Sequence, residues 1–389
     1  MIARIILPII LAIVLPEIYF DIHYLHHRFK YKLAKRLLWL TPGFLMLVYS
    51  ICLATTKNFV TDDLKWINLY LALVGLFVNP KAVYALCSFI GLLVCKIFHT
   101  HKNWGNLVGL FGALFGVYVF LYGYTIGFHK LEVNRVDLSF PDLPKTFDGY
   151  RILQFSDAHV GTYTGKRLKI LNRAIDSIKA QKVDIIVFTG DIQNTQPSEL
   201  YPVQGLLSSV KAKDGVFSIL GNHDYSQYIK ADPAIKIANE RETIARERQF
   251  GWKLLLNEHS AIHRGKDSIV IAGEENEGIP PFPEKSDIDK TLKGVPPQTF
   301  VVMLQHDPSA WRRNILPKSH AQLTLSGHTH GGQLSILGLR PTMFRLNEDR
   351  GLYEDNGRYL YVNAGLGGVV PFRFGVSSEI TIITLHKSK

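Results

Sequence analysis

Long apolar runs fill the first 128 residues of the chain and are rare after that point. A bilayer core of about 30 Å is crossed by a helix of roughly 20 mostly apolar residues, because each residue rises about 1.5 Å. Glycines at positions 109, 112 and 116 of the last run would let helices approach closely in lipid. The sequence therefore predicts a transmembrane domain, 1–128, of about five helices, at 2–20, 37–54, 64–78, 82–98 and 107–128.

Two alternatives bear on this count. The short runs 64–78 and 82–98 are separated by Asn-Pro-Lys at 79–81, which predicts a tight hairpin; if one of the two only dips into the membrane, four spans remain. The run 2–20 also suits a cleaved signal peptide, but no small-x-small cleavage site follows it and further spans do. We therefore interpret 2–20 as a retained span.

Basic residues predict the orientation, because cytoplasmic loops are enriched in lysine and arginine. The loop after the first span carries five of them: Arg28, Lys30, Lys32, Lys35 and Arg36. Five spans then place residues 129–389 in the cytoplasm, beneath the cell (inner) membrane. Four spans would move them to the other face.

Composition excludes some classes of function. The net charge of +11 suits attraction to anionic headgroups or phosphorylated substrates, or simply a lysine-rich surface with basic loops. Without an arginine-rich stripe interleaved with aromatics, a nucleic-acid partner has little support. All three cysteines, at 52, 87 and 95, lie in the membrane half, so the soluble half has no disulfide framework and no thiolate nucleophile or ligand.

After a predicted linker, 129–149, six short apolar segments of strand length each end in a polar cluster. Residues 166–180 carry apolar side chains at helical spacing between the first two segments, which predicts a strand–helix–strand unit. Sites in such sheets gather at the carboxyl ends of the strands. The six segments of this 150–389 domain are 151–159, 183–191, 215–224, 269–276, 300–307 and 322–330.

The strand ends supply nitrogen and oxygen donors of the kind that manganese, iron and zinc take. They are Asp157, His159, Asp191, Asn222, His223, His306, His328 and His330. Each motif alone has a plain interpretation: a chance D-x-H, a Gly-Asn turn, a surface H-x-H or a core histidine. Five of the six segments end in such a donor, whereas the fourth ends in Glu274 and Glu275, which we assign to structure or rim. Seven of these eight donors would already be too many ligands for one metal ion, and they suit two divalent metal ions that share one carboxylate.

These motifs resemble the calcineurin-like metallophosphoesterase superfamily. D-x-H (Asp157, His159), G-D (Gly190-Asp191), G-N-H-D (221–224), His306 and G-H-T-H (327–330) occur in order, over about residues 150–385. Gly331-Gly332-Gln333 and the tail YVNAGLGGVVPFRFG are similar to the bacterial membrane-associated branch. The resemblance implies an α/β fold, a four-layer α/β/β/α sandwich.

The resemblance also implies roles for the donors. Asp157, His159 and His330 would hold one metal, and Asn222, His306 and His328 the other. Asp191 would bridge them, and a hydroxide between the metals would attack phosphorus in line. His223 would stabilise the transition state or protonate the leaving oxygen.

The sequence departs from the family pattern at one position. Many relatives carry G-D-x-x-D, whose last aspartate can orient the catalytic histidine, but this chain has Asn194 there. Asp224 would be the substitute partner, so we place it with His223 among the catalytic residues. The metal assignment is unaffected.

The leading hypothesis is a membrane-anchored, metal-dependent hydrolase of a phosphoester or pyrophosphate. Relatives that cleave UDP-diacylglucosamine make a lipid-linked substrate one option and a soluble substrate the other. A groove lined by Phe282, Phe372 and Phe374 would favour lipid. A non-catalytic membrane sensor or scaffold is the alternative from another class, disfavoured because no ligand is missing. A transporter is disfavoured because the spans hold few charges.

Overall fold

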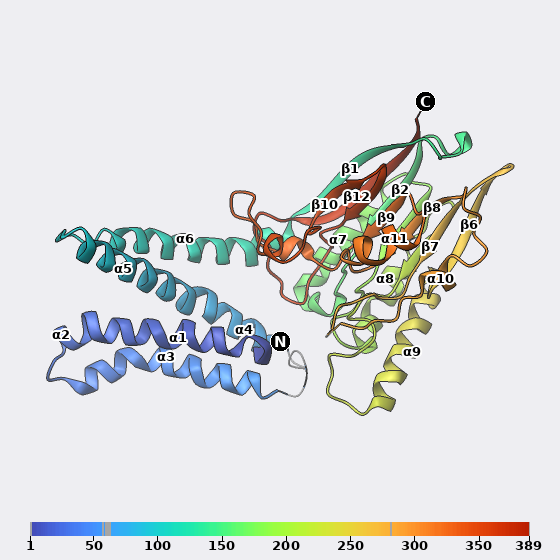
Figure 1. Ribbon diagram of the computed structural model, residues 1–389. Coiled ribbons are helices and arrows are strands. Elements are labelled where there is room, and N and C mark those ends of the chain that lie inside the picture. Colours follow the sequence, from blue (N-terminus) through green and yellow to red (C-terminus); the bar gives the residue numbers. More distant parts are fainter. Residues whose placement is uncertain (1, 57, 59–63, 281, 389) are drawn as a thin grey trace. The chain divides into compact units, whose positions relative to one another are not determined.

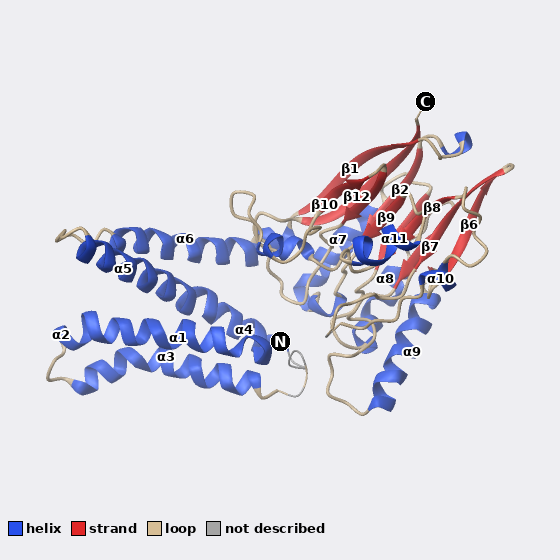
Figure 2. Cartoon of the chain, viewed as in Figure 1, coloured by secondary structure: helices blue, strands red, loops and turns tan. Residues whose placement is uncertain are grey.

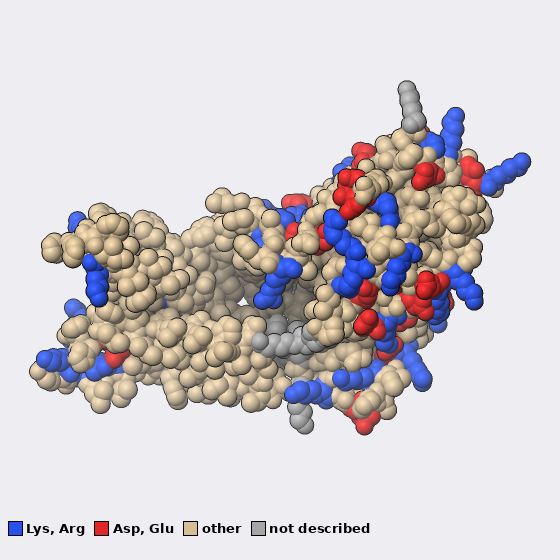
Figure 3. Space-filling view, viewed as in Figure 1, with Lys and Arg blue, Asp and Glu red and all other residues tan. Residues whose placement is uncertain are grey.

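The computed structural model describes residues 2–56, 58, 64–280 and 282–388. The chain forms two compact units, Met1–Tyr124 and Thr125–Lys389 (Figure 1). All of the strands lie in the second unit, as Figure 2 shows. Charged side chains on the visible face of the first unit lie mainly near its ends, whereas they are spread over the second (Figure 3). This distribution is typical of a membrane half joined to a soluble half.

The described residues of the first unit form helices joined by short turns. By length and composition, four helical stretches can cross a membrane: Ile6–Arg28, Leu33–Ala54, Leu64–Ile97 and Gly105–His129. They contain α1 (Ile6–Phe20), α2 (His26–Arg28), α3 (Leu33–Ala54), α4 (Leu64–Leu73), α5 (Asn79–Ile97) and α6 (Gly105–Thr125).

The hairpin expected at 79–81 is wrong, and the prediction of about five spans becomes four. The segments 64–78 and 82–98 form one continuous helical stretch, in which α4 passes through a π-helical turn, Val74–Val78, into α5. Pro80 lies in the first turn of α5. A proline inside a helix lacks a donor and clashes with the preceding turn, and a π turn supplies the extra residue that relieves both problems.

Glycines bring α5 and α6 together, as the sequence predicted. A Cβ built on Gly105 would lie 2.2 Å from the carbonyl oxygen of Cys87. One built on Gly109 would lie 3.0 Å from the carbonyl oxygen of Tyr84 and 3.1 Å from the Cβ of Cys87. Because the nearest atoms belong mostly to the backbone, only glycine allows this separation of the two helices.

An ion pair joins α1 and α5. The Lys81 ammonium lies 2.5 Å from Oε1 of Glu17, and both side chains are largely buried. Gly43 of α3 leaves the space that Glu17 occupies, since a Cβ there would lie 2.2 Å from the same oxygen. Three membrane helices therefore meet at one charged contact, which sequence reasoning missed because Lys81 was placed in a loop.

Replacing Gly109 by leucine should separate α5 from α6. Overpacking of this kind costs roughly 1–3 kcal/mol. We expect a lower melting temperature for the detergent-solubilised chain, followed by intrinsic fluorescence. Leu110→Val, on the exposed face of α6, is the control and should melt like the parent. Equal melting of both variants would contradict the close approach.

The second unit contains two six-stranded sheets. The first has the order β1-β12-β2-β3-β4-β5 and the second the order β10-β11-β9-β8-β7-β6. The first sheet contains β1 (Leu131–Phe140), β2 (Tyr150–Phe155), β3 (Ile185–Thr189), β4 (Val216–Ile219), β5 (Lys253–Leu254) and β12 (Ser378–Lys387). The second contains β6 (Glu258–Arg264), β7 (Asp267–Gly273), β8 (Phe300–Leu304), β9 (Leu323–Ser326), β10 (Gly351–Asp355) and β11 (Arg358–Val362).

Three apolar clusters separate four layers. One packs α7 (Leu168–Lys179) and α8 (Gln204–Ser208) on the first sheet, through residues such as Ile175 and Phe188. A second fills the space between the sheets, where Ile152 and Ile271 are fully buried. The third packs α10 (Ile288–Thr291) and Trp311 on the second sheet. The remaining helices are α9 (Pro233–Gln249) and α11 (Leu316–Lys318).

The predicted α/β/β/α sandwich is thus confirmed, with the six expected segments forming β2, β3, β4, β7, β8 and β9. The linker expected at 129–149 is wrong for residues 131–140, which form β1, a ten-residue strand parallel to β12. Most of its side chains are exposed or half-buried, because β1 lies at the edge of the sheet, and only Leu138 and Phe140 near its end are buried. An edge strand leaves too weak an apolar pattern to be recognised from sequence.

Candidate metal centre

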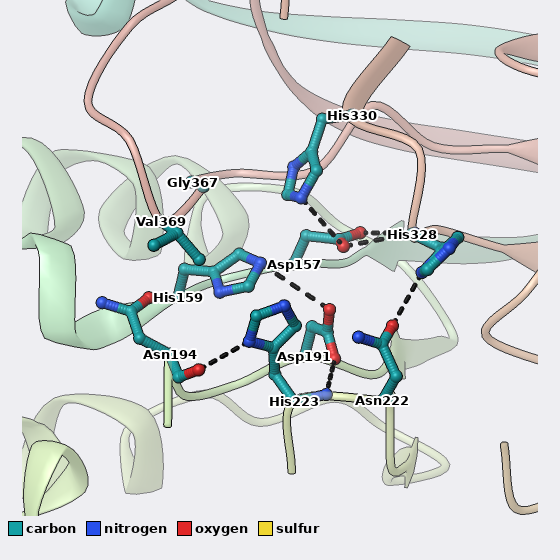
Figure 4. Close-up of polar contacts among 12 residues, drawn as sticks. Asp157, His159, Asp191, Asn194, Asn222, His223, His328, His330, Gly367 and Val369 are labelled. Carbon is teal, nitrogen blue, oxygen red and sulfur yellow. Dashed lines mark hydrogen bonds and ion pairs between the residues drawn. The ribbon is translucent and has the colours of Figure 1, made fainter. Parts of the chain in front are cut away.

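The eight donors predicted from sequence converge at the carboxyl ends of β2, β3, β4, β8 and β9 (Figure 4). The strands are short and, apart from Arg151 of β2, buried along their length, and the loop after each strand reaches the common centre. Most of the donors are almost completely inaccessible to solvent, and His223, His328 and His330 are partly exposed. The centre is therefore enclosed, with the partly exposed histidines at its opening.

Five of these donors have left-handed backbone conformations. Their φ angles are 48° at Asp157, 44° at His159, 62° at Asp191, 73° at His328 and 53° at His330. Such angles are uncommon outside glycine. Each costs on the order of 1–3 kcal/mol and persists only where contacts with the surrounding structure offset that cost. Strain of this kind gathers at functional sites, so the geometry supports a ligand centre independently of the residue types.

Motif glycines allow the loops to touch. A Cβ on Gly327 would lie 1.8 Å from Oγ of Ser156 and 2.4 Å from Oδ2 of Asp157. Gly190 has a φ of 93°, and its Cβ would lie 2.6 Å from the nitrogen of Gly221. These glycines are needed because a Cβ would collide with the side chains of Ser156 and Asp157 at Gly327 and with the backbone of Gly221 at Gly190.

Asp157, His159 and His330 form the first cluster, with one donor atom from each within 4.8 Å of the others. Both ring nitrogens of His159 and Nδ1 of His330 are buried and have no hydrogen-bond partner in the described part of the chain. Buried polar atoms are nearly always bonded. Burial lowers the pKa of His159 to about 3 and that of His330 well below its usual range, which keeps both rings neutral. Neutral imidazoles with free lone pairs fit a divalent metal ion.

Asp191, His306 and His328 form the second cluster, and Oδ1 of Asn222 lies 3.2 Å from Nε2 of His306. Nε2 of His306 lies 3.2 Å from Oδ2 of Asp191, and Nδ1 of His328 lies 2.7 Å from Oδ1 of Asn222. Nδ1 of His306 donates to the carbonyl of Thr189 (2.7 Å), which directs Nε2 into the centre.

The pKa shifts in the second cluster also indicate a site for a cation. Burial acts to lower the pKa of His306, but the negative charge of Asp191 outweighs it and raises this pKa to about 10. Burial likewise acts to raise the pKa of Asp191, but the neighbouring histidines hold it well below its usual range. The pocket therefore favours a positive charge beside an ionised carboxylate, as a divalent ion would supply.

Asp191 belongs to both halves of the centre. Its Oδ2 lies 3.7 Å from Nε2 of His159 and 3.2 Å from Nε2 of His306. Its other oxygen, Oδ1, accepts the backbone N–H of His223 at 2.8 Å. This position between the clusters is the one expected of a bridging carboxylate.

A backbone carbonyl orients His223. Nδ1 of the ring lies 2.5 Å from the carbonyl oxygen of Asn194, so Nδ1 carries a proton in this arrangement. Sequence reasoning focused on the side chain at position 194, but that amide contacts Thr162 instead. A main-chain acceptor leaves no signal in the sequence, so this partner could not have been found there.

Asp224, expected to assist His223, lies fully buried under the loops. Its Oδ2 accepts the backbone N–H groups of Asp191 and Gly221, each at 2.8 Å. Its Oδ1 accepts those of Ile192 (3.0 Å) and Gln193 (3.3 Å). With both oxygens occupied in this way, Asp224 is placed to hold the two metal-binding loops together rather than to contact substrate.

Comparison with known proteins gives the same picture. A model of the calcineurin-like phosphoesterase family matches residues 150–332, and one for a probable calcineurin-like phosphoesterase transmembrane domain matches 3–128. The "uncharacterized metallophosphoesterase YkuE" of Bacillus subtilis is 32% identical over 295 residues, which cover 72% of this chain and 96% of the relative. The chain belongs to the calcineurin-like phosphoesterase family. The resemblance recognised in the sequence is confirmed, and the protein is a phosphoester hydrolase.

Other relatives of this phosphoesterase match about two thirds of the chain. A "transmembrane protein with metallophosphoesterase domain" of Danio rerio is 28% identical over 277 residues, 69% of this chain but only 60% of that protein. The "UDP-2,3-diacylglucosamine pyrophosphatase LpxG" of Chlamydia muridarum is 28% identical over 296 residues, 65% of this chain and 88% of the relative. The family uses divalent metals, and the two donor clusters of this phosphoesterase fit them.

Loss of a ligand from one cluster should remove one ion selectively. We expect the purified phosphoesterase, loaded with manganese, to hold two equivalents by plasma mass spectrometry. His330→Ala should reduce this to about one, because three donors become two while the second cluster is intact. His263→Ala, exposed on β6, should retain both ions, and full occupancy in His330→Ala would refute the assignment.

Proposed function

We propose that this phosphoesterase cleaves a phosphoester or pyrophosphate bond with two divalent cations (Mn, Fe or Zn) in its centre, on a lipid-linked substrate. The observation that carries the two-ion proposal is the position of Asp191, which belongs to the second cluster and places its Oδ2 3.7 Å from Nε2 of His159 in the first. When bound, such a pair of ions makes a nucleophile from water near neutral pH and neutralises charge on the phosphoryl oxygens. A purely binding role, as a sensor or scaffold, has less support because every expected ligand is present.

His223 is the proposed proton donor to the leaving oxygen. With Nδ1 donating to the carbonyl of Asn194, protonation of Nε2 would give an imidazolium that can pass the Nε2 proton to the leaving oxygen. Asp224 contributes by fixing the loops that carry Asp191 and His223. We therefore assign Asp224 a positioning role in place of the catalytic one expected from sequence.

Replacing His223 by alanine should lower turnover by about 10²–10⁴-fold, because a positioned acid contributes that much. Bound metal should stay unchanged, whereas Asn222→Ala or His328→Ala should lose metal and activity together. Hydrolysis of a phosphodiester with an alkyl leaving group, whose alkoxide needs a proton to depart, measures turnover by the full chain, and metal analysis runs in parallel. Undiminished turnover in His223→Ala would exclude the acid role.

The route of the chain supports a substrate at the bilayer surface. The last membrane helix is followed directly by β1, whose first residue, Leu131, is paired with Ser378 of β12. β12 runs antiparallel to β2 with Thr381 opposite Gln154, so Ser378 lies beyond the carboxyl end of β2, towards Asp157. The chain thus enters the catalytic domain at the edge that carries the metal ligands.

A lipid tail would also find an apolar contact there. The ring of Phe282 packs edge-to-face on His328, with centroids 5.1 Å apart. Relatives named UDP-2,3-diacylglucosamine pyrophosphatase act on a nucleotide joined to an acylated sugar. A lipid-linked pyrophosphate such as UDP-diacylglucosamine is therefore the substrate class we propose, in preference to a soluble ester.

Four spans reverse the orientation expected from five. The basic loop between α1 and α3 and the turn between α5 and α6, which is flanked by Lys96 and Lys102, lie at the same end of the bundle (Figure 1). If this end is cytoplasmic, the even number of spans places the catalytic domain on the opposite face. We propose this orientation in place of the cytoplasmic one, in the cell (inner) membrane.

Cysteine accessibility tests the orientation. In a variant without Cys52, Cys87 and Cys95, we expect Lys145→Cys to react with an impermeant maleimide in intact spheroplasts. Lys30→Cys should react only after lysis. The reverse pattern would restore a cytoplasmic catalytic domain.

A further inference from the structure

Large apolar side chains stand exposed on one segment of the second unit, residues 336–344, here called the apolar loop. Leu337 is 99% exposed and Phe344 is 80% exposed. Three more exposed side chains lie between or beside them: Ile336, Leu339 and Met343. Single exposed apolar residues are ordinary, but a cluster within nine residues marks a contact surface.

The apolar loop is held from beneath. Asp349, itself almost fully buried, forms an ion pair with Arg340 (2.6 Å) and accepts a hydrogen bond from the hydroxyl of Thr342 (2.8 Å). Ile336 and Leu339 close the tip with a pair of backbone hydrogen bonds of 3.0 Å each. The exposed side chains are therefore presented by a fixed scaffold.

The scaffold of the apolar loop is continuous with the metal centre. Gly331 and Gly332 follow His330 in the chain. A Cβ built on Gly331 would lie 3.0 Å from the side chain of Arg350, and one built on Gly332 would lie 3.2 Å from the side chain of Thr342. The next residue, Gln333, donates through Nε2 to the carbonyls of Val370 and Phe372. The loop thus forms part of the rim around the ligands.

The same rim receives the chain from the membrane. Ser335 donates its backbone N–H to the carbonyl of Phe374 (2.7 Å). Phe374 lies shortly before β12, which begins at Ser378. The backbone N–H of Ser378 in turn donates to the carbonyl of Lys130, at the start of β1. The last membrane-spanning stretch ends at the residue before Lys130, His129. The apolar loop and the membrane exit therefore share one edge of the second unit.

We propose that the apolar loop inserts into the interface of the bilayer that the chain's own helices span, and so holds the metal centre at headgroup level. Leu337 and Phe344 would enter the acyl boundary, while Arg345, exposed beside Phe344, would meet anionic headgroups. The purpose assigned to this contact, delivery of a lipid-linked phosphate, rests on the proposed function. The contact itself does not.

Depth-dependent quenching tests insertion without reference to catalysis. The full chain lacking its three cysteines carries an environment-sensitive nitrobenzoxadiazole label at Leu337→Cys and is reconstituted in phosphatidylcholine–phosphatidylglycerol vesicles. We expect a blue-shifted emission that lipids with doxyl groups near the headgroup quench. The control is Lys266→Cys. Lys266 is exposed in the turn before β7, and this turn lies at the amino end of β7, the end away from the metal donors. A label at Leu337 that stays in water, or is shielded without quenching by lipid, would overturn the proposal.

Activity gives a second readout. Leu337→Asp with Phe344→Asp should lower hydrolysis of a vesicle-borne lipid diphosphate, relative to bis-p-nitrophenyl phosphate, by about tenfold or more, because two large apolar groups leave the interface. Lys266→Asp should leave the ratio unchanged, and an unchanged ratio in the double variant would contradict delivery by the apolar loop. If the unaltered chain cleaves only soluble esters, the proposal of a lipid-linked substrate is wrong. The quenching experiment then still decides whether the apolar loop inserts into the bilayer.

Discussion

The carboxylate of Asp191 is the contact on which the catalytic half depends. It faces His159 on one side and His306 on the other, and it accepts the backbone of His223. It can do so because Gly190 turns the chain sharply and Asp224 gathers the backbone N–H groups around it. The strained backbone of the neighbouring donors is tolerable only inside such a cross-linked set of loops.

The two sheets explain why sequence reasoning located this centre. Short strands buried on both faces give continuous apolar runs, and their ends bring polar residues to one edge. Metal donors at those ends were recognisable because each had to be a particular residue type. The φ angles of Asp157 and His330, by contrast, belong to the loops and could not be read from residue type.

Other features depended on contacts that sequence patterns do not encode. The edge strand β1 has a weak apolar alternation because it packs on one neighbour. Pro80 suggested a turn, but a π-helical turn before it accommodates the missing donor within a helix. The partner of His223 is a carbonyl group, which any residue at position 194 would provide. Each difference arises where the backbone or a tertiary neighbour decides the outcome rather than side-chain identity.

The contact between Glu17 and Lys81 has a consequence for how the protein is made. The two charges are separated by 64 residues, so the first span leaves the ribosome well before its counter-charge is synthesised. An isolated charge at the centre of a span is unfavourable by about 2.5–3.5 kcal/mol on insertion scales. The first helix therefore gains its full stability in lipid only when the third arrives, which makes insertion of these two segments cooperative and ties assembly of the bundle to completion of its third span.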